Sequence, residues 1–176
     1  MTTLARSELL AGLEPQHITA LVNLADTVSL QSGTRLFSLG DRADNLYVVL
    51  SGRVLLSLPL NIKGGPQDVF VEEKRPGEIL GWSALVPPHR FTLSASARMD
   101  STLAVFRQDQ LKELFEQVPA LGHTVILNLA TVLGNRLHKV QAMWVREVQR
   151  GLDLRFGTVR ETGGAGDAGA NGPQGR

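Results

Sequence analysis

The stretch that decides the fold is GEILGWSALVPPHRFT, residues 77–92. Two glycines, Gly77 and Gly81, flank a short apolar pair, and a short segment then leads through two prolines to Arg90. This order favours a strand that turns into a short helix and presents backbone N–H groups beside an arginine. Free N–H groups at a helix start and a guanidinium together bind a phosphate or another anion. The stretch therefore predicts an anion-binding turn with Arg90 as its cation.

Short apolar segments separated by turn residues lie on both sides of this stretch. Residues 46–58 give the strongest strand pattern, with Gly52 as a bulge or tight turn. Several short strands at this spacing indicate a sandwich or a jelly-roll barrel. The further expected elements are strands over residues 69–71, 91–97 and 102–106, and a hairpin loop over residues 61–66.

Helical periodicity lies before and after the strands. Residues 4–25 carry apolar positions at helical spacing, with Pro15 in the first turn of a second helix. After the strands, a short helix is expected from Gln108 to near Pro119, followed by a long helix from about 120 to 149.

The long helix has an apolar stripe with gaps of three and four residues, which approximates the seam of a coiled coil. A helix packed on its own barrel is the alternative. We favour self-association as a homodimer, because the stripe is longer than the end of a barrel could cover. The expected dimer interface consists of Leu129, Leu133, Leu137, Val140 and Trp144.

Length and composition indicate one globular domain with an appendage. The 176 residues carry a net charge of +1, so no global field points to nucleic acid or a membrane. Cysteine is absent, which excludes disulfides and thiolate metal sites. No signal peptide or membrane-spanning run is found, and a cytoplasmic protein is expected. The expected domain covers residues 1–150, with the barrel over about 27–107 and the hinge and long helix over about 108–150; a Gly-rich, disordered tail is expected over 151–176.

Residues 9–150 resemble the cyclic nucleotide-binding domain family, which includes bacterial catabolite-activator-like regulators. The turn Gly40-Asp41, the strand-glycine-strand unit 46–54 and the stretch 77–81 carry the resemblance in this order. It implies an α+β, mainly β fold: a double-stranded β-helix or jelly-roll barrel with short N-terminal helices and a long C-terminal dimerisation helix. It also implies cAMP, cGMP or another anionic nucleotide as ligand, with no other cofactor required. The expected ligand-binding residues are Gly81, Trp82, Ser83, Ala84, Leu85, Arg90, Phe91 and Thr92.

Trp82 departs from the family pattern. In nucleotide-binding members a glutamate follows the glycine at the Gly81 position and accepts a hydrogen bond from the ribose 2′-hydroxyl, whereas indole only donates. We expect the ring of Trp82 to fill the pocket; the alternative is a stacking surface for a planar ligand. Residues 81–92, which resemble the phosphate-binding segment of this family, are called the cassette below. For Arg90 the alternatives to anion binding are a surface salt bridge and a structural contact that holds the cassette in place.

The sequence contains no catalytic pattern. The four histidines lie far apart, without paired carboxylates at ligand spacing, so no metal site is expected. No serine lies in a nucleophile elbow, and no Walker loop is found. Catabolite-activator-like regulators carry a helix-turn-helix module after the dimer helix, and the roughly 26 residues after position 150 cannot form it. We therefore expect neither an enzyme nor direct DNA binding.

Three functions remain open. The leading one is a stand-alone dimeric sensor, which binds its ligand at the cassette and signals by helix rearrangement to an unknown protein partner. The second is a ligand-free dimeric scaffold whose degenerate pocket is filled by Trp82. The third is a transcriptional regulator of the Crp-Fnr type that acts without a helix-turn-helix of its own.

Overall fold

The computed structural model describes residues 2–62 and 64–156 of the chain. It divides into two units, residues 1–133 and residues 134–176, which are described in turn. The part of the expected disordered tail from residue 157 onward lies outside the described residues, and so does Lys63 in the expected hairpin loop.

Three short helical elements precede the strands of the first unit: α1 (Thr2–Ala5), η1 (Glu8–Leu10) and α2 (Pro15–Leu24). Pro15 occupies the start of α2, as expected, because its missing N–H has no partner to lose there. Leu9 and Leu10 are buried, so this helical region is part of the core.

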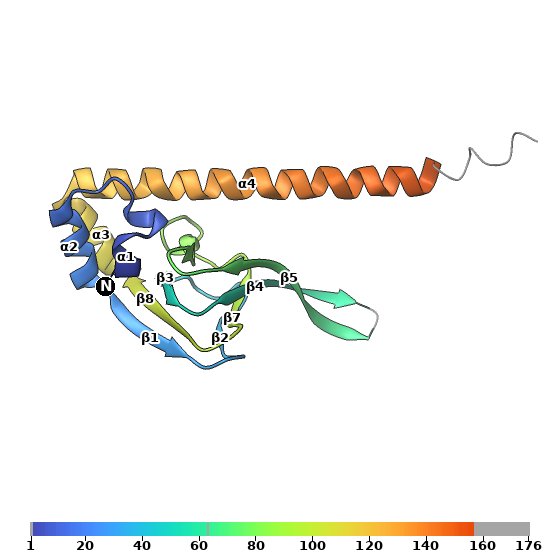
Figure 1. Cartoon of the computed structure of the whole chain (residues 1–176), viewed down its shortest axis with the longest axis horizontal. Helices are drawn as coiled ribbons and strands as arrows, with labels where there is room; N and C mark the ends of the chain where they lie inside the picture. Colours follow the sequence, from blue (N-terminus) through green and yellow to red (C-terminus); the bar gives the residue numbers. More distant parts are fainter. Residues whose placement is uncertain (1, 63, 157–176) are drawn as a thin grey trace, which may run out of the picture. The chain divides into compact units, whose positions relative to one another are not determined.

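Two four-stranded antiparallel sheets form the barrel (Figure 1). In the first sheet the order is β1 (Asp26–Leu30), β8 (Ser101–Arg107), β3 (Asn45–Ser51) and β6 (Ile79–Leu80). In the second sheet the order is β2 (Arg35–Phe37), β7 (Ser94–Ala97), β4 (Val54–Ile62) and β5 (Gly65–Lys74). This arrangement confirms the mainly β, jelly-roll prediction.

Gly52 forms the tight turn between β3 and β4. Its φ is +82°, and a Cβ there would lie 2.3 Å from Oγ of Ser101 and 2.4 Å from the carbonyl oxygen of Asp100. Only glycine fits this position, because both the conformation and the space exclude a side chain.

The observed strand boundaries differ from the predicted ones at two places. The β4–β5 hairpin is longer than predicted, since its strands run to Ile62 and begin again at Gly65. The strand expected over 91–97 begins only at Ser94. The N–H of Phe91 donates to the carbonyl of Asp41, and Phe91 accepts from the N–H of Gly40, so this residue pairs with a loop instead of the sheet.

Two helices follow the barrel: α3 (Gln108–Gln117) and α4 (Pro119–Phe156). The predicted bounds of α3 are confirmed. The long helix extends beyond its predicted end near residue 149, because a single glycine such as Gly151 costs only about 1 kcal/mol in a helix. No helix within residues 2–62 and 64–156 is long and apolar enough to cross a membrane.

The start of α4 belongs to the core of the first unit. Leu121, Val125 and Leu129 are at most 2% exposed, and Leu133 packs against the same core. The assignment of Leu129 to a dimer interface is therefore wrong, since its side chain is already covered within the single chain.

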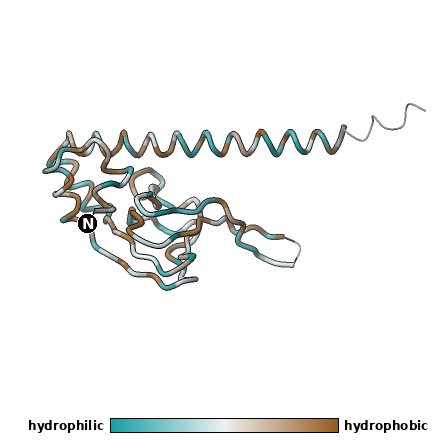
Figure 2. Tube along the Cα trace, in the orientation of Figure 1, coloured by the Kyte–Doolittle hydropathy of each residue, from teal (hydrophilic) through white to brown (hydrophobic). Residues whose placement is uncertain are grey.

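In the second unit, the α4 segment from Gly134 leaves its apolar side chains exposed. Exposure is 56% for Leu137, 49% for Val140 and 68% for Trp144. Figure 2 shows hydrophobic residues recurring along this segment. The helical pattern thus serves two purposes, burial in the core up to residue 133 and an exposed apolar face after it.

Candidate ligand-binding cassette

Gly81 links β6 to a short helical turn, η2 (Trp82–Ala84). Its φ is +76°, and a Cβ there would lie 2.9 Å from the carbonyl oxygen of Asn45 and 3.0 Å from Cδ2 of Tyr47. Burial raises the pKa of the Tyr47 hydroxyl, which also accepts a hydrogen bond from Asn45. A glycine is required where the cassette passes this closely over β3.

The short helix η2 contributes two buried residues to the cassette. The N–H of Ala84 donates to the carbonyl of Gly81, and the N–H of Leu85 donates to that of Trp82, both at 3.0 Å. Ser83 and Ala84 are buried, and Leu85 is half-buried. The amides at the start of such a turn have no partner within it, because partners would have to precede the turn.

Trp82 is half-buried and packs against the hydrophobic core. The contact shows Trp82 as a packing residue of the barrel, and whether its ring fills the pocket or offers a stacking surface stays a prediction. The side chain directly after Gly81 is thus an indole, which can donate a hydrogen bond but cannot accept one.

Arg90 is exposed and lies in the part of the cassette that follows η2, which is called the arm here. Its Nη1 donates to the carbonyl of Gly40 at 2.8 Å, and its backbone forms an antiparallel bridge with Arg42. No carboxylate in the described part of the chain forms an ion pair with Arg90. The salt bridge that stood as an alternative to anion binding is therefore not observed there; the guanidinium bonds to a neutral carbonyl, and its other N–H groups are available to an anion.

Phe91 and Thr92, the last two expected ligand residues, have opposite environments. Phe91 is 6% exposed and stacks on Phe37 with ring centroids 3.7 Å apart. Thr92 is exposed. Phe91 thus anchors the arm to the barrel, whereas Arg90 and Thr92 on either side of it reach solvent.

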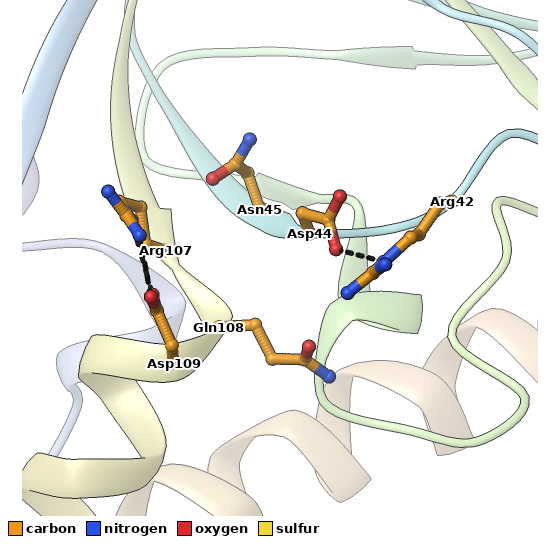
Figure 3. A pocket seen from close by; sticks show the side chains of 6 residues that line it. All are labelled: Arg42, Asp44, Asn45, Arg107, Gln108 and Asp109. Carbon is orange, nitrogen blue, oxygen red and sulfur yellow. Dashed lines mark hydrogen bonds and ion pairs between the residues drawn. The ribbon is translucent and has the colours of Figure 1, made fainter.

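A hollow of about 510 Å³ lies beside the cassette, at the junction of β8 and α3 (Figure 3). It contains two ion pairs, each with an N–O distance of 2.6 Å. In one of them the hydrogen bond from Arg107 lowers the pKa of Asp109, and the same bond raises the pKa of Arg107. The lining residues are Arg42, Asp44, Asn45, Arg107, Gln108 and Asp109.

Gln108, the first residue of α3, connects this hollow to the cassette. Its Nε2 lies 2.5 Å from the carbonyl oxygen of Ala84 and 2.9 Å from Nδ1 of His89. Gln108 was not among the residues that the sequence pattern predicts for the site. A polar residue directly after the last strand was the only sequence signal, and nothing in the sequence indicated its partners.

The described residues contain no group of three or more histidine, aspartate or glutamate side chains that could hold a metal ion. The candidate site brings together backbone groups, the guanidinium of Arg90 and the hydrogen bond from Gln108 of α3.

Comparison with known proteins gives the family. A family model described as "Cyclic nucleotide-binding domain" matches residues 27–118. The chain is 32% identical to the "Cyclic AMP receptor protein" of Thermus thermophilus, over 84% of this chain and 62% of that protein. It is also 28% identical to "Glutaminase 1" of Bradyrhizobium diazoefficiens, over 77% of this chain and 21% of that protein.

Solved structures agree with these matches. The catabolite activator protein of Thermus thermophilus is 29% identical with a TM-score of 0.64, over 84% of this chain and 62% of that one. A putative cyclic nucleotide-binding protein from Geobacter metallireducens GS-15 is 28% identical with a TM-score of 0.62, over 74% of this chain and 92% of that one. The chain spans less than two thirds of the curated relatives it matches. The barrel, the glycine-cradled cassette and these matches together establish that the chain belongs to the cyclic nucleotide-binding domain family, and its relatives include Crp-like regulators.

Proposed function

We propose that this chain is a dimeric regulatory module that binds a small anionic ligand at residues 81–92 and signals through α3 and α4 to a protein partner. A cyclic nucleotide is the first candidate ligand, in keeping with the family. The observation that carries the proposal is Arg90: its guanidinium is exposed, bonds to a neutral carbonyl and lies on the arm that follows η2.

The ligand is an anion because the cassette offers donors. A guanidinium and backbone N–H groups bind phosphate oxygens, and a cyclic phosphodiester presents such oxygens with one negative charge. Thr92 adds an exposed hydroxyl next to the arm. Trp82 in place of an acceptor removes the usual partner of a ribose hydroxyl, so the sugar contributes less to recognition here.

Dimerisation is proposed through the second unit. An exposed apolar stripe at coiled-coil spacing is covered most simply by the same stripe of a second copy. The exposed stripe consists of Leu137, Val140 and Trp144, and it begins one helical turn after Leu133, which packs on the core. We further place the module in the cytoplasm, in keeping with its lack of cysteine.

A second candidate function is a scaffold without ligand, and the packing of Trp82 on the core favours it. A third is transcriptional regulation, favoured by relatives such as the "CRP-like cAMP-activated global transcriptional regulator" of Mycobacterium tuberculosis, of which the chain covers 58%. Ligand binding separates the first candidate from the second, and DNA binding that weakens steeply with salt would support the third.

The test is the melting temperature of the purified protein with cAMP and with cGMP. A ligand at a hundredfold over its dissociation constant adds about 2.7 kcal/mol to the stability, so binding gives a plain shift. Arg90→Glu should abolish the shift. Arg6→Glu is the matched control, because it makes the same charge change at an exposed position outside the cassette. A shift that survives Arg90→Glu would overturn the anion role, and no shift with either nucleotide would favour the scaffold.

A further inference from the structure

The side-chain amide of Gln108 lies next to two cassette atoms, the carbonyl oxygen of Ala84 and Nδ1 of His89. The carbonyl oxygen always accepts a hydrogen bond, whereas Nδ1 accepts one only when it carries no proton. The carbonyl oxygen of Ala84, 2.5 Å from Nε2 of Gln108, can only accept. This contact orients the side-chain amide with its NH₂ group toward the cassette, as Figure 3 shows for the direction of the side chain. The second hydrogen of that NH₂ group then faces Nδ1 of His89, at 2.9 Å.

His89 has a choice of partners at the same ring nitrogen. Nδ1 lies 2.9 Å from Nε2 of Gln108, which is a donor, and 3.2 Å from the carbonyl oxygen of Ser83, which is an acceptor. Without a proton, Nδ1 accepts from Gln108. With a proton, Nδ1 donates to Ser83 and opposes the NH₂ group of Gln108. The proton on Nδ1 therefore decides whether the ring bonds to α3 or to η2.

We propose that His89 and Gln108 form a proton-controlled latch between the cassette and α3. In the closed latch, Gln108 donates to both Ala84 and His89 and ties the cassette to the first residue of α3. In the open latch, protonated His89 bonds to Ser83 instead, and Gln108 loses one of its two cassette partners. Gln108 acts as a positioning residue through its contacts with Ala84 and His89 of the cassette.

The backbone around His89 makes the latch specific to this position. His89 has a φ of +56°, which few non-glycine residues adopt, and its carbonyl accepts from the N–H of Ala43 at 2.9 Å. These constraints hold the main chain of His89, and its ring lies within hydrogen-bonding distance of Gln108, which is itself half-buried. Because both partners already lie within hydrogen-bonding distance of Nδ1, the ring can change partner without a change of the backbone.

Several charged groups belong to the segments around the latch. The elements whose contacts reach His89 are η2, the loop 40–44 and the start of α3, and η2 has no titratable side chain. Carboxylates and guanidiniums ordinarily keep their charge between pH 5 and 8, whereas histidine changes its charge there. The charged neighbours are Asp41, Arg42, Asp44, Arg90, Arg107 and Asp109, of which Arg42–Asp44 and Arg107–Asp109 are ion pairs.

The latch predicts that acidification loosens the cassette from α3. Loss of one hydrogen bond corresponds to a factor of about three to ten in a local opening equilibrium. That a ligand uses this link for signalling rests on the proposed function; the latch itself exists without a ligand.

The experiment measures amide hydrogen exchange of the full, ligand-free chain at pH 7.5 and pH 5.5, corrected for the intrinsic rate at each pH. A peptide from the cassette is compared with a peptide from β3 in the same sample. In the unmodified protein, cassette protection relative to β3 should fall by about three- to tenfold at pH 5.5. His89→Asn should remove the pH dependence, since asparagine tolerates a left-handed φ and does not titrate in this range.

Gln108→Glu gives the sharpest result. A carboxylate of the same length repels the carbonyl of Ala84 but accepts from protonated His89, so cassette protection should now rise at pH 5.5. Gln117→Glu makes the same change at an exposed position of α3 whose partner is Glu113, and it should behave like the unmodified protein. The same direction of pH dependence in Gln108→Glu and the unmodified protein would overturn the latch, and so would a flat profile in the latter.

The position of the proton on His89 can also be measured in the unmodified protein by NMR. Long-range ¹H–¹⁵N correlations of ¹⁵N-histidine protein at pH 7.5 should place the proton of His89 on Nε2, and a proton on Nδ1 would overturn the proposal. Failure of the proposed function and failure of the latch would give different experimental results. In that case cyclic nucleotides would not bind while the pH dependence persisted; binding with a flat exchange profile would contradict the latch alone.

Discussion

Gly81→Ala tests whether the cassette is built as closely onto β3 as the structure indicates. Any L-residue at a left-handed φ of +76° costs about 1–2 kcal/mol. The new Cβ would in addition lie 2.9 Å from a backbone oxygen, 3.0 Å from Tyr47 and 3.3 Å from Phe91, all closer than ordinary contact. Overpacking of this kind costs about 1–3 kcal/mol, so the total loss should be about 2–5 kcal/mol.

Gly12→Ala separates the two contributions. Gly12 has nearly the same φ, +73°, but no heavy atom within 4 Å of the position of a Cβ. Its variant should lose only the conformational part, about 1–2 kcal/mol. The assay is urea denaturation followed by far-ultraviolet circular dichroism, at one fixed protein concentration because association affects apparent stability. Equal losses in the two variants would refute the close approach of the cassette to β3.

Three further predictions concern dimerisation, a surface ion network and the ligand. Leu137→Arg combined with Val140→Arg should halve the molecular mass measured by light scattering, whereas Ala142→Arg, on another face of α4, should leave it unchanged; an unchanged mass in the double variant would contradict the seam. Glu73 accepts hydrogen bonds from Arg53 and Arg98, which lower the pKa of its carboxyl, so its stabilising effect exists above the ordinary carboxyl pKa and disappears as the pH falls through the lowered value. Glu73→Gln should therefore lower the urea midpoint at pH 7, with a difference that shrinks in acid, and a difference that grows in acid would be inconsistent with this sign. Because Trp82 offers no acceptor to the ribose, cAMP and 2′-deoxy-cAMP should have similar affinities by calorimetry, and strong preference for cAMP would reveal another acceptor.

The barrel was predictable because its determinants are local. Turn glycines such as Gly52 and Gly81 mark places where only a residue without a side chain fits, and the alternating segments between them define strands. The strand boundaries near Phe91 were less predictable. Its backbone partners lie in the loop near Asp41, about fifty residues away in the sequence. Strand propensity depends on neighbouring residues and does not predict such distant pairing.

The long helix illustrates a second limit. Leu129 and Leu137 follow the same helical spacing, yet one is 2% exposed and the other 56%. Periodicity identifies an apolar face but not the surface that covers it, so the sequence could not show where packing on the barrel ends.

The candidate site was predictable where it depends on residue type and unpredictable where it depends on contacts across the fold. Arg90 and Gly81 were identified from their order in the sequence. The link from Gln108 to Ala84 joins residues 24 positions apart, and the link to His89 joins residues 19 apart. No sequence pattern predicts that such distant groups lie within hydrogen-bonding distance of one another.

The central claim is that the cassette binds a ligand and that α3 responds to it. The most direct measurement is amide hydrogen exchange at pH 7.5 with and without saturating cAMP, and separately with cGMP, for the unmodified protein, Arg90→Glu and Arg6→Glu. We expect one of these nucleotides to protect residues 81–92 and to change exchange in residues 108–117, in the unmodified protein and in Arg6→Glu but not in Arg90→Glu. Unchanged exchange in both segments with either nucleotide, or protection that persists in Arg90→Glu, would contradict the account.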